Sequence, residues 1–192
     1  MDGLEIKIDN FSPLFDKSNM EYKEFPSDFS QIRFYTMCLV RSAPSEIREF
    51  NLLEQQISEI IKNAVKHGNK NDINKKVKIW YSLTAEAAHL IVEDEGEGFK
   101  DLEKWNSFNR KRLQYIGEQN FNDLGKYVSF RGADSDNCDG GNALFAALEY
   151  WNGGLVFNEK RNIVGMKKFF NSKSSSTEEV LSDIKPWDAT RF

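Results

Sequence analysis

The stretch "EIIKNAVKHGNK", residues 59–70, decides which fold this sequence is expected to adopt. Its apolar residues recur at helical spacing, and Gly68 followed by a polar run should end the helix in a left-handed cap. Asn63 lies inside this helix, although asparagine in a helix interior costs roughly half a kcal/mol relative to alanine. Glu59 lies about one turn before Asn63, and Lys66 or His67 lies about one turn after it, so three side chains share one stripe.

This stripe combines three groups that suit a phosphorylated, metal-bound ligand. The amide oxygen of Asn63 is a hard ligand of the kind that Mg²⁺ accepts. The carboxylate of Glu59 could take a proton from an attacking hydroxyl group or water. An ordinary solvated helix face is the alternative interpretation of the same residues.

A second stretch, "LIVEDEGEGF" at 90–99, passes from a strand into a turn that contains two glycines. Asp94 shares one strand face with two apolar residues, so its carboxylate should also face the core. A buried carboxylate is costly without a partner, and the exocyclic amine of adenine would be such a partner. Gly96 and Gly98 would let the backbone approach a flat base closely. A simple acidic turn after a strand is the alternative.

The third stretch, "DGGNALFAALEYW" at 139–151, places the pair Gly140 and Gly141 just before a helix. Free backbone N–H groups and the positive end of the helix dipole favour the binding of phosphate at such a position. A plain loop-to-helix turn would have the same sequence pattern.

Length and composition favour one intracellular domain. The chain has 192 residues, of which 40% are hydrophobic, and this is enough for one core. A formal net charge of -4 argues against a nucleic-acid or anionic-membrane partner. Cys38 and Cys138 have no histidine neighbours, so reduced thiols are expected rather than a disulfide or a zinc site. No signal-peptide pattern and no apolar run of ~20 residues are present, so we expect a cytoplasmic protein.

Periodicity predicts two helices, a hairpin, a helical insert, a loop, a third helix and a second hairpin. In the first helix, the buried stripe is expected to contain Phe29, Ile32, Phe34, Met37 and Val40 or Leu39, with Ser27 at the N-cap. This order is typical of an α/β (α+β) sandwich, in which helices pack on one face of an antiparallel-dominated mixed sheet. The expected parts are an N-terminal extension at 1–20, the main domain at 21–170 with a helical insert at 100–128 and a loop at 129–142, and a polar, flexible tail at 171–192.

Together the three stretches resemble the ATP-binding domain shared by gyrase, heat-shock chaperones, histidine kinases and mismatch-repair ATPases, the GHKL superfamily. The likeness rests on E-x-x-x-N-A-x-x-H-G at 59–68, on D-x-G-x-G at 94–98 and on the glycine motif before a helix. It covers roughly residues 20–170 and implies the Bergerat-type ATP-binding fold. Within the superfamily the chain looks most like the anti-sigma-factor serine-protein kinases, which are also small and keep N-A-x-x-H-G.

The resemblance implies a role for each motif residue. Glu59 would be the catalytic base, Asn63 the Mg²⁺ ligand and Asp94 the residue that recognises adenine. Residues 129–142 would form the ATP lid. The other implied contacts with the nucleotide are Lys66, Gly96, Gly98, Gly140, Gly141 and Asn142.

Two features depart from the family pattern. The lid of the family usually reads G-x-G before a large apolar residue, whereas this chain has Ala143 in place of the second glycine. Alanine keeps its N–H, so binding could survive while closure of the lid changes. The insert at 100–128 is longer than in small anti-sigma kinases, and it would form a partner surface or reshape the nucleotide pocket.

By this resemblance the protein would be a serine/threonine kinase that transfers the γ-phosphate of ATP to a partner in a bacterial-type partner-switching pathway. The partner would be similar to an anti-sigma antagonist or a sigma factor, and a homodimer stays open. A nucleotide-gated binding regulator with little turnover is the main alternative. A histidine kinase core is disfavoured because it needs a phosphoacceptor histidine upstream, and the two histidines are His67 and His89.

Overall fold

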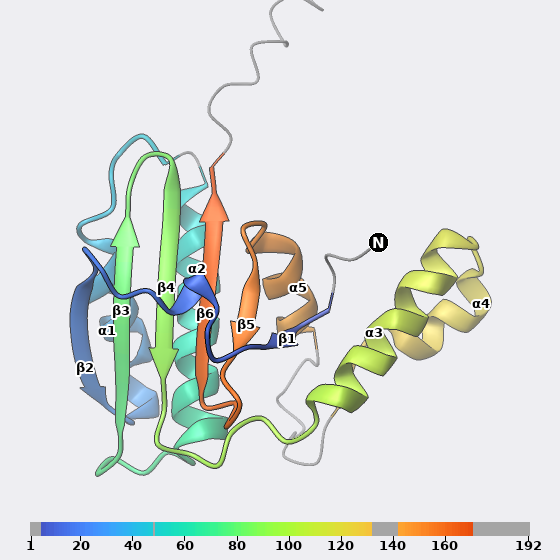
Figure 1. Cartoon of the computed structure of the whole chain (residues 1–192), viewed down its shortest axis with the longest axis horizontal. Coiled ribbons are helices and arrows are strands. Elements are labelled where there is room, and N and C mark those ends of the chain that lie inside the picture. The colour runs from blue at the N-terminus through green and yellow to red at the C-terminus, as the bar shows by residue number, and fades with distance from the viewer. Residues whose placement is uncertain (1–4, 48, 132–141, 171–192) are drawn as a thin grey trace, which may run out of the picture.

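The computed structural model describes residues 5–47, 49–131 and 142–170, which form a six-stranded sheet with helices (Figure 1). The strand order is β1-β5-β6-β4-β3-β2. Neighbouring strands are antiparallel except for β1 and β5, which run parallel. The strands are β1 (Lys7–Ile8), β2 (Glu21–Pro26), β3 (Lys76–Leu83), β4 (Ala87–Glu93), β5 (Leu155–Phe157) and β6 (Ile163–Phe169).

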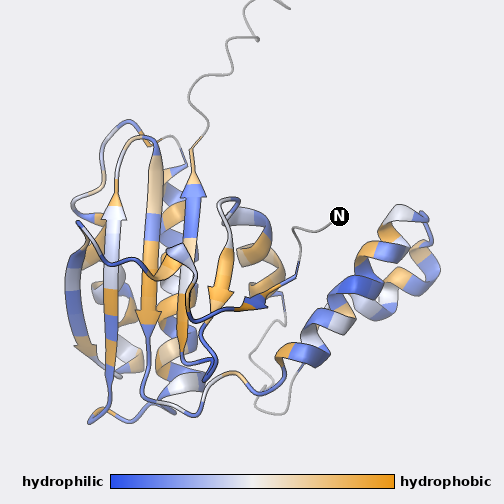
Figure 2. Ribbon diagram, in the orientation of Figure 1, coloured by the Kyte–Doolittle hydropathy of each residue, from blue (hydrophilic) through white to orange (hydrophobic). Residues whose placement is uncertain are grey.

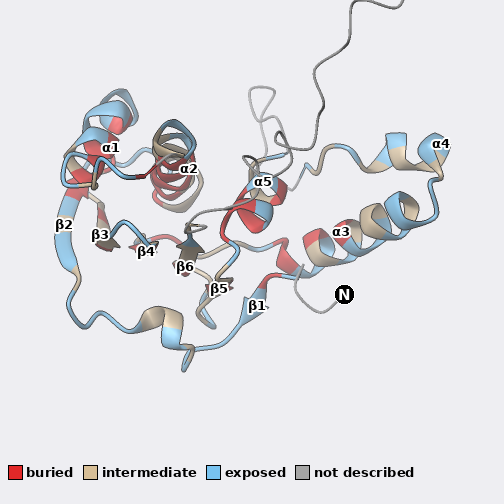
Figure 3. Cartoon of the chain, turned by 90° about the horizontal axis from the view of Figure 1, so that it is seen from above, coloured by how far each residue is buried: buried red, intermediate tan, exposed pale blue. Residues whose placement is uncertain are grey.

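Helices α1, α2 and α5 cover one face of the sheet, as the view in Figure 3 shows. The α-helices are α1 (Ile32–Val40), α2 (Phe50–Asn63), α3 (Leu102–Gly117), α4 (Phe121–Leu124) and α5 (Ala143–Tyr150). The π-helical turn η3 (Ala64–Gly68) continues α2, and three short 3-10 turns are η1 (Pro13–Phe15), η2 (Phe29–Gln31) and η4 (Gly125–Tyr127). The predicted sandwich, with helices on one face of an antiparallel-dominated mixed sheet, is confirmed.

The core lies between the sheet and the helices that cover it, where orange apolar residues gather in Figure 2. Strand β3 buries alternate residues, because successive side chains of a strand point to opposite faces, whereas β4 also buries Ile91 on its other face. Helix α2 buries residues at helical spacing against them. The fully buried residues include Leu53, Ile57 and Ile61 from α2, Val77 and Ile79 from β3, and Ala88, Leu90 and Ile91 from β4.

The N-terminal segment is part of the sheet and of its second face. Strand β1 pairs with β5 at one edge. Residues around η1 then cross the face opposite the helices (Figure 3), where the carbonyl oxygen of Leu14 lies 2.9 Å from Nε2 of His89. Gly165 of β6 faces the backbone of Leu14 so closely that a Cβ atom there would require a shift. The segment expected as an extension therefore supplies an edge strand and covers part of the open face.

The predicted buried stripe of α1 is right in part. Ile32 and Leu39 are buried as predicted, whereas Phe29, Phe34 and Met37 are 49%, 59% and 44% exposed. The sequence of α1 carries apolar residues on two adjacent stripes, and packing against the sheet selects the one that contains Ile32, Tyr35 and Leu39.

The predicted N-cap at Ser27 is also wrong. Asp28 is the N-cap of η2, and its side chain accepts a hydrogen bond from the N–H of Ser30. Ser27 is fully buried instead, and its hydroxyl oxygen accepts a hydrogen bond from the side-chain amide of Asn69 at 2.7 Å.

The predicted helical insert forms α3, α4 and η4, which lie beside the sheet in Figure 1. Trp105 is buried, and its ring lies 5.0 Å from that of Phe145 in α5. Most of the expected lid and the whole expected tail lie outside the described residues. None of the described helices is both long and apolar enough to cross a membrane.

Candidate functional site

A cavity of about 210 Å³ lies among α2, η3, the end of β4, the start of α3, and the segments around β5 and β6. It collects residues from two of the three sequence motifs and from the helix that follows the third. Glu59, Asn63, Asp94 and Gly98 line it, and Ala143 lines it from the start of α5. Its remaining walls are largely apolar, with Phe99, Trp105, Phe130, Leu144, Leu155 and Phe157 among them.

Asp94 follows β4 directly and is half-buried at the cavity. Its Oδ1 accepts a hydrogen bond of 2.8 Å from the N–H of Gly96. Burial raises the pKa of Asp94 to about 6, because a low-dielectric surrounding disfavours the charged form. The Gly96 hydrogen bond and the positive charges of Lys160 and Lys75 oppose this rise in the pKa. The protein therefore offsets only part of the cost of burying this carboxylate, which can also accept a hydrogen bond from a ligand.

The turn η3, which continues α2, packs closely against the turn after Asp94. A Cβ atom at Gly68 would overlap the carboxylate of Asp94, and one at Gly96 would overlap the carbonyl group of Gly68. The backbone φ of Gly68 is not in the left-handed region, so the predicted left-handed cap is wrong. The helix ends in η3, where the N–H of Asn69 donates to the carbonyl oxygen of Ala64 at 2.8 Å. Glycine is needed at 68 because Asp94 packs against it.

Gly98 meets a different constraint. Its φ of 85° is in the left-handed region, and an added Cβ atom would overlap the carbonyl oxygen of Lys160. The next residue, Phe99, donates its N–H to the carbonyl oxygen of Arg161 at 3.0 Å. The turn between β5 and β6 thus packs directly on the glycine turn that lines the cavity.

The polar residues of α2 reach the cavity from the other side. Asn63, the last residue of α2, is half-buried. Glu59 forms an ion pair of 3.2 Å with Lys62, and both side chains are about one third exposed, at 34% and 31%. Lys62, which also lines the cavity, was not among the predicted site residues. Its position three residues after Glu59 on a helix was the available signal.

Either Lys66 or His67 was predicted to share the stripe of Glu59 and Asn63. Lys66 is half-buried on η3 and is not among the residues that line the cavity. A π turn is wider than an α turn, so it rotates the residues after it relative to α2. His67 lines the cavity in its place.

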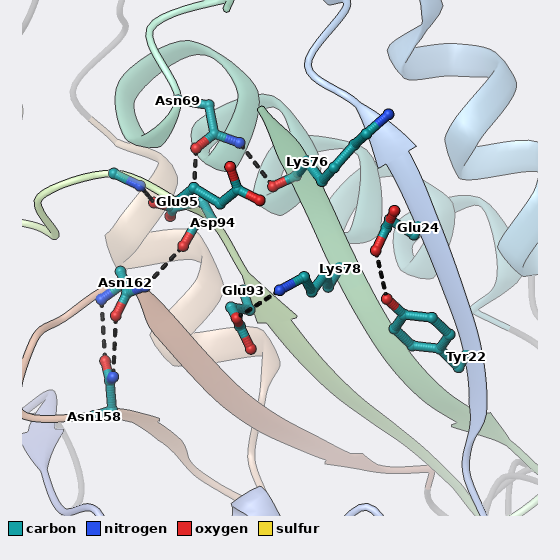
Figure 4. Close-up of polar contacts among 11 residues, drawn as sticks. Tyr22, Glu24, Asn69, Lys76, Lys78, Glu93, Asp94, Glu95, Asn158 and Asn162 are labelled. Carbon is teal, nitrogen blue, oxygen red and sulfur yellow. Dashed lines mark hydrogen bonds and ion pairs between the residues drawn. The ribbon is translucent and has the colours of Figure 1, made fainter. Parts of the chain in front are cut away.

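Two asparagines that sequence reasoning missed hold the Asp94 turn (Figure 4). The fully buried Asn69 accepts a hydrogen bond of 2.7 Å from the N–H of Glu95 through Oδ1. Asn162 donates from Nδ2 to the carbonyl oxygen of Asp94, also at 2.7 Å. Asn69 stands in a polar run that reads as a loop, and nothing in the sequence around Asn162 marks it.

The insert and the lid region contribute unequally to the described site. Lys100, Asp101 and Trp105 line the cavity, so the insert supplies part of one wall. The predicted Gly140 and Gly141 lie outside the described residues. Asn142 is exposed before α5, and its carbonyl oxygen accepts a hydrogen bond of 3.1 Å from the N–H of Ala146.

The donor atoms of the site suit a magnesium ion that is shared with a ligand. Among the described residues, no group of three or more His, Cys, Asp or Glu side chains could hold a metal ion. Mg²⁺ keeps several waters and binds through one or two protein groups plus the phosphates of a substrate. The amide oxygen of Asn63 at the cavity is compatible with this mode and would not suffice as an all-protein site.

Comparison with known proteins agrees with this arrangement. An anti-sigma F factor of Shouchella clausii is 28% identical over 88 residues, which cover 46% of this chain and 60% of that protein. An anti-sigma F factor of Geobacillus stearothermophilus is 38% identical over 56 residues, which cover 29% of this chain and 38% of that protein. The serine-protein kinase RsbW of Bacillus subtilis is 28% identical over 137 residues, which cover 71% of this chain and 75% of that protein.

The chain thus spans three fifths or less of these two anti-sigma F factors. The family model of the histidine kinase-like ATPase domain matches residues 26–130, which is more than half of the chain. The predicted resemblance to the GHKL superfamily and to its anti-sigma kinases is confirmed by these matches. The chain therefore belongs to the family of histidine kinase-like ATPase domains.

Proposed function

We propose that this protein is an ATP-binding serine/threonine-protein kinase of the anti-sigma-factor type, which acts on a partner protein. The observation that carries the proposal is the presence of Glu59, Asn63 and Asp94 around one cavity, although they are distant in sequence. The names of the similar proteins, anti-sigma F factor and serine-protein kinase, support the same class.

Recognition of the base is assigned to Asp94. Its carboxylate would accept a hydrogen bond from the exocyclic amine of adenine. Guanine presents an acceptor oxygen at the equivalent position, and a polar site built for one pattern discriminates by about 10⁴-fold against a ligand that leaves its groups unpaired. Gly98 lines the cavity and would lie beside the base, whereas Gly96 does not line it. The Cβ positions of Gly96 and Gly98 point at the carbonyl groups of Gly68 and Lys160, so these glycines let the turn pack closely against the protein next to the base.

Phosphoryl transfer in this class depends mainly on the positioning of groups and on charge. Asn63 would hold Mg²⁺ through its amide oxygen, and the ion would neutralise charge on the phosphates. Glu59 would orient the hydroxyl group of the partner and accept its proton as the γ-phosphoryl group passes from ATP to that oxygen, leaving ADP. Assignment of Lys66, Gly140, Gly141 and Asn142 to phosphate binding rests on the sequence motifs.

The partner would be a protein similar to an anti-sigma antagonist or a sigma factor. A regulator that binds nucleotide with little turnover is the second candidate, and Ala143 favours it. This residue replaces a glycine of the lid motif and lines the cavity at the start of α5. Its methyl group removes backbone freedom where the lid joins the helix.

Thermal unfolding with and without Mg-ATP tests nucleotide binding. We expect Mg-ATP to raise the melting temperature of the wild type, because a ligand that binds the folded state stabilises it. Asp94→Asn should remove this rise, since the amide offers one acceptor oxygen and also a competing donor. An unchanged melting curve for the wild type would refute nucleotide binding.

Phosphotransfer is tested separately with a partner captured from the native cell in the presence of ATP, followed by mapping of phosphorylated residues. Glu59→Ala should retain affinity for ATP and lose transfer to the partner. Equal labelling of the partner by the wild type and by Glu59→Ala would refute the assignment of the base. Affinity for ATP without any labelled partner would favour the binding regulator.

A further inference from the structure

The turn at residues 94–96, called the Asp94 turn below, is held by two asparagine side chains from different parts of the chain (Figure 4). Asn69 lies directly after η3, and Asn162 lies directly before β6. The first bonds to the N–H of Glu95 and the second to the carbonyl oxygen of Asp94. Both polar groups of the peptide unit between Asp94 and Glu95 are therefore held by side chains.

Asn69 uses both halves of its amide group. Its Oδ1 accepts from the N–H of Glu95 at 2.7 Å, while its Nδ2 donates to the hydroxyl oxygen of Ser27 at 2.7 Å and to the carbonyl oxygen of Lys76 at 2.9 Å. The side chain is fully buried, so each of these bonds lies in a surrounding of low dielectric. Only an amide of this length supplies an acceptor on one side and two donors on the other.

Asn162 approaches from the opposite side and is itself oriented. Its N–H donates to Oδ1 of Asn158 at 3.0 Å, and its Oδ1 accepts from Nδ2 of Asn158 at 3.1 Å. Its backbone oxygen accepts from the N–H of Asp94 at 3.0 Å, and its Nδ2 donates to the carbonyl oxygen of Asp94 at 2.7 Å. Asp94 is thereby held through both of its backbone polar groups by one residue.

We infer that Asn69 and Asn162 are positioning residues for purine recognition, which hold the Asp94 turn so that the carboxylate keeps one orientation at the cavity. The inference rests on the proposed function, because it assigns the purpose of that orientation. A half-buried carboxylate gains from moving toward water. The two asparagines oppose this movement by fixing the backbone from which the carboxylate projects, and so keep it within reach of the N–H of Gly96, which bonds to its Oδ1. Loss of either asparagine should therefore lower the ratio of the affinities for ATP and GTP, whereas loss of an asparagine elsewhere, at a similar cost in the free energy of unfolding, should not.

The test compares Asn162→Ala and Asn69→Ala with Asn152→Ala in the full chain. Asn152 is a matched control, because its side-chain amide bonds to the N–H and carbonyl oxygen of Phe169 at the far end of β6. It does not line the cavity. Calorimetric titration with Mg-ATP and Mg-GTP gives the ratio of the two affinities, and urea unfolding gives the loss of stability in each variant.

We expect the preference for ATP over GTP to fall about tenfold in Asn162→Ala and in Asn69→Ala, which is about the effect of one lost hydrogen bond. Asn152→Ala should keep the wild-type ratio even where its stability falls as much as that of Asn162→Ala. If Asn69→Ala does not fold, the comparison of Asn162→Ala with Asn152→Ala decides the matter. An unchanged ratio in Asn162→Ala, with a selective wild type, would overturn the positioning role and leave the proposed function intact. A wild type that binds neither nucleotide would instead overturn the proposed function itself.

Discussion

Replacement of Asp94 by asparagine is expected to stabilise the nucleotide-free protein near neutral pH while it abolishes ATP binding. Burial raises the pKa of this carboxyl group to about 6, so the ionised form that exists at neutral pH is disfavoured in the folded state. Asparagine keeps an oxygen that can accept the hydrogen bond from the N–H of Gly96, and it carries no charge.

The magnitude follows from the pKa difference between the folded and unfolded states. The ordinary value is 3.8 and the folded value is about 6, and this difference corresponds to about 3 kcal/mol in the free energy of unfolding. The folded state binds the proton of this carboxyl group more tightly than the unfolded state does. Above about pH 6, the free energy of unfolding of the wild type is therefore lowered by the full amount of this difference. The destabilisation disappears as the pH falls from about 6 to about 4.

Urea unfolding of the wild type and of Asp94→Asn at pH values from 4 to 8 measures this difference. The variant should be more stable by about 2–3 kcal/mol at pH 7–8, and the two proteins should converge near pH 4. Asp72→Asn is the control, because Asp72 is exposed and its Oδ1 accepts hydrogen bonds from the backbone and side-chain N–H groups of Asn74. A variant that is less stable than the wild type at pH 7, or a difference that does not change with pH, would refute the argument from burial.

Three further results are expected from the same geometry. Affinity for adenosine, which carries no titrating phosphate, should fall as the pH drops below about 6, because protonation of Asp94 removes the acceptor for the adenine amine. Calorimetry would measure this affinity, and an affinity that does not change with pH would contradict the prediction. Gly98→Ala should lower the free energy of unfolding by about 1–3 kcal/mol or more through its left-handed φ, whereas Gly125→Ala, with open space around it, should not. Trp105→Ala should lower the free energy of unfolding by about 3–5 kcal/mol, because it empties a buried site against Phe145; urea unfolding that shows a loss below 1 kcal/mol would contradict this packing.

The sheet and the main helices were predictable because their signals are periodic and local. Alternation in β3, followed by a short turn and a second apolar stretch, predicted the pairing of β3 and β4, and the spacing of apolar residues in α2 predicted which face it buries. In α1 the same approach chose Phe34 and Met37 as inward residues, because two apolar stripes compete in that sequence. Only the position of the helix over the sheet decides between them.

The candidate site was predictable where short motifs carry the chemistry and unpredictable where distant segments meet. Glu59, Asn63 and Asp94 were identified from their motifs, and the structure brings them to one cavity. The need for glycine at 68 comes from the carboxylate of Asp94, 26 positions later in the chain, and not from the helix end itself. A property that depends on such a contact has no local pattern in the sequence.

The structure around Asp94 departs from ordinary local rules at several adjacent points. A carboxylate is partly buried, a helix ends in a π turn, and Gly98 adopts a left-handed φ. The first two features are unfavourable by themselves and persist only because neighbouring contacts hold them, whereas the third is a backbone conformation that glycine adopts readily. A ligand with an amine donor at the cavity would offset the burial of Asp94 by pairing with it, so nucleotide binding and folding should be coupled through this residue. The hydrogen bonds from Asn69 and Asn162 would keep the turn in one geometry, so that a ligand meets the carboxylate of Asp94 in a fixed orientation.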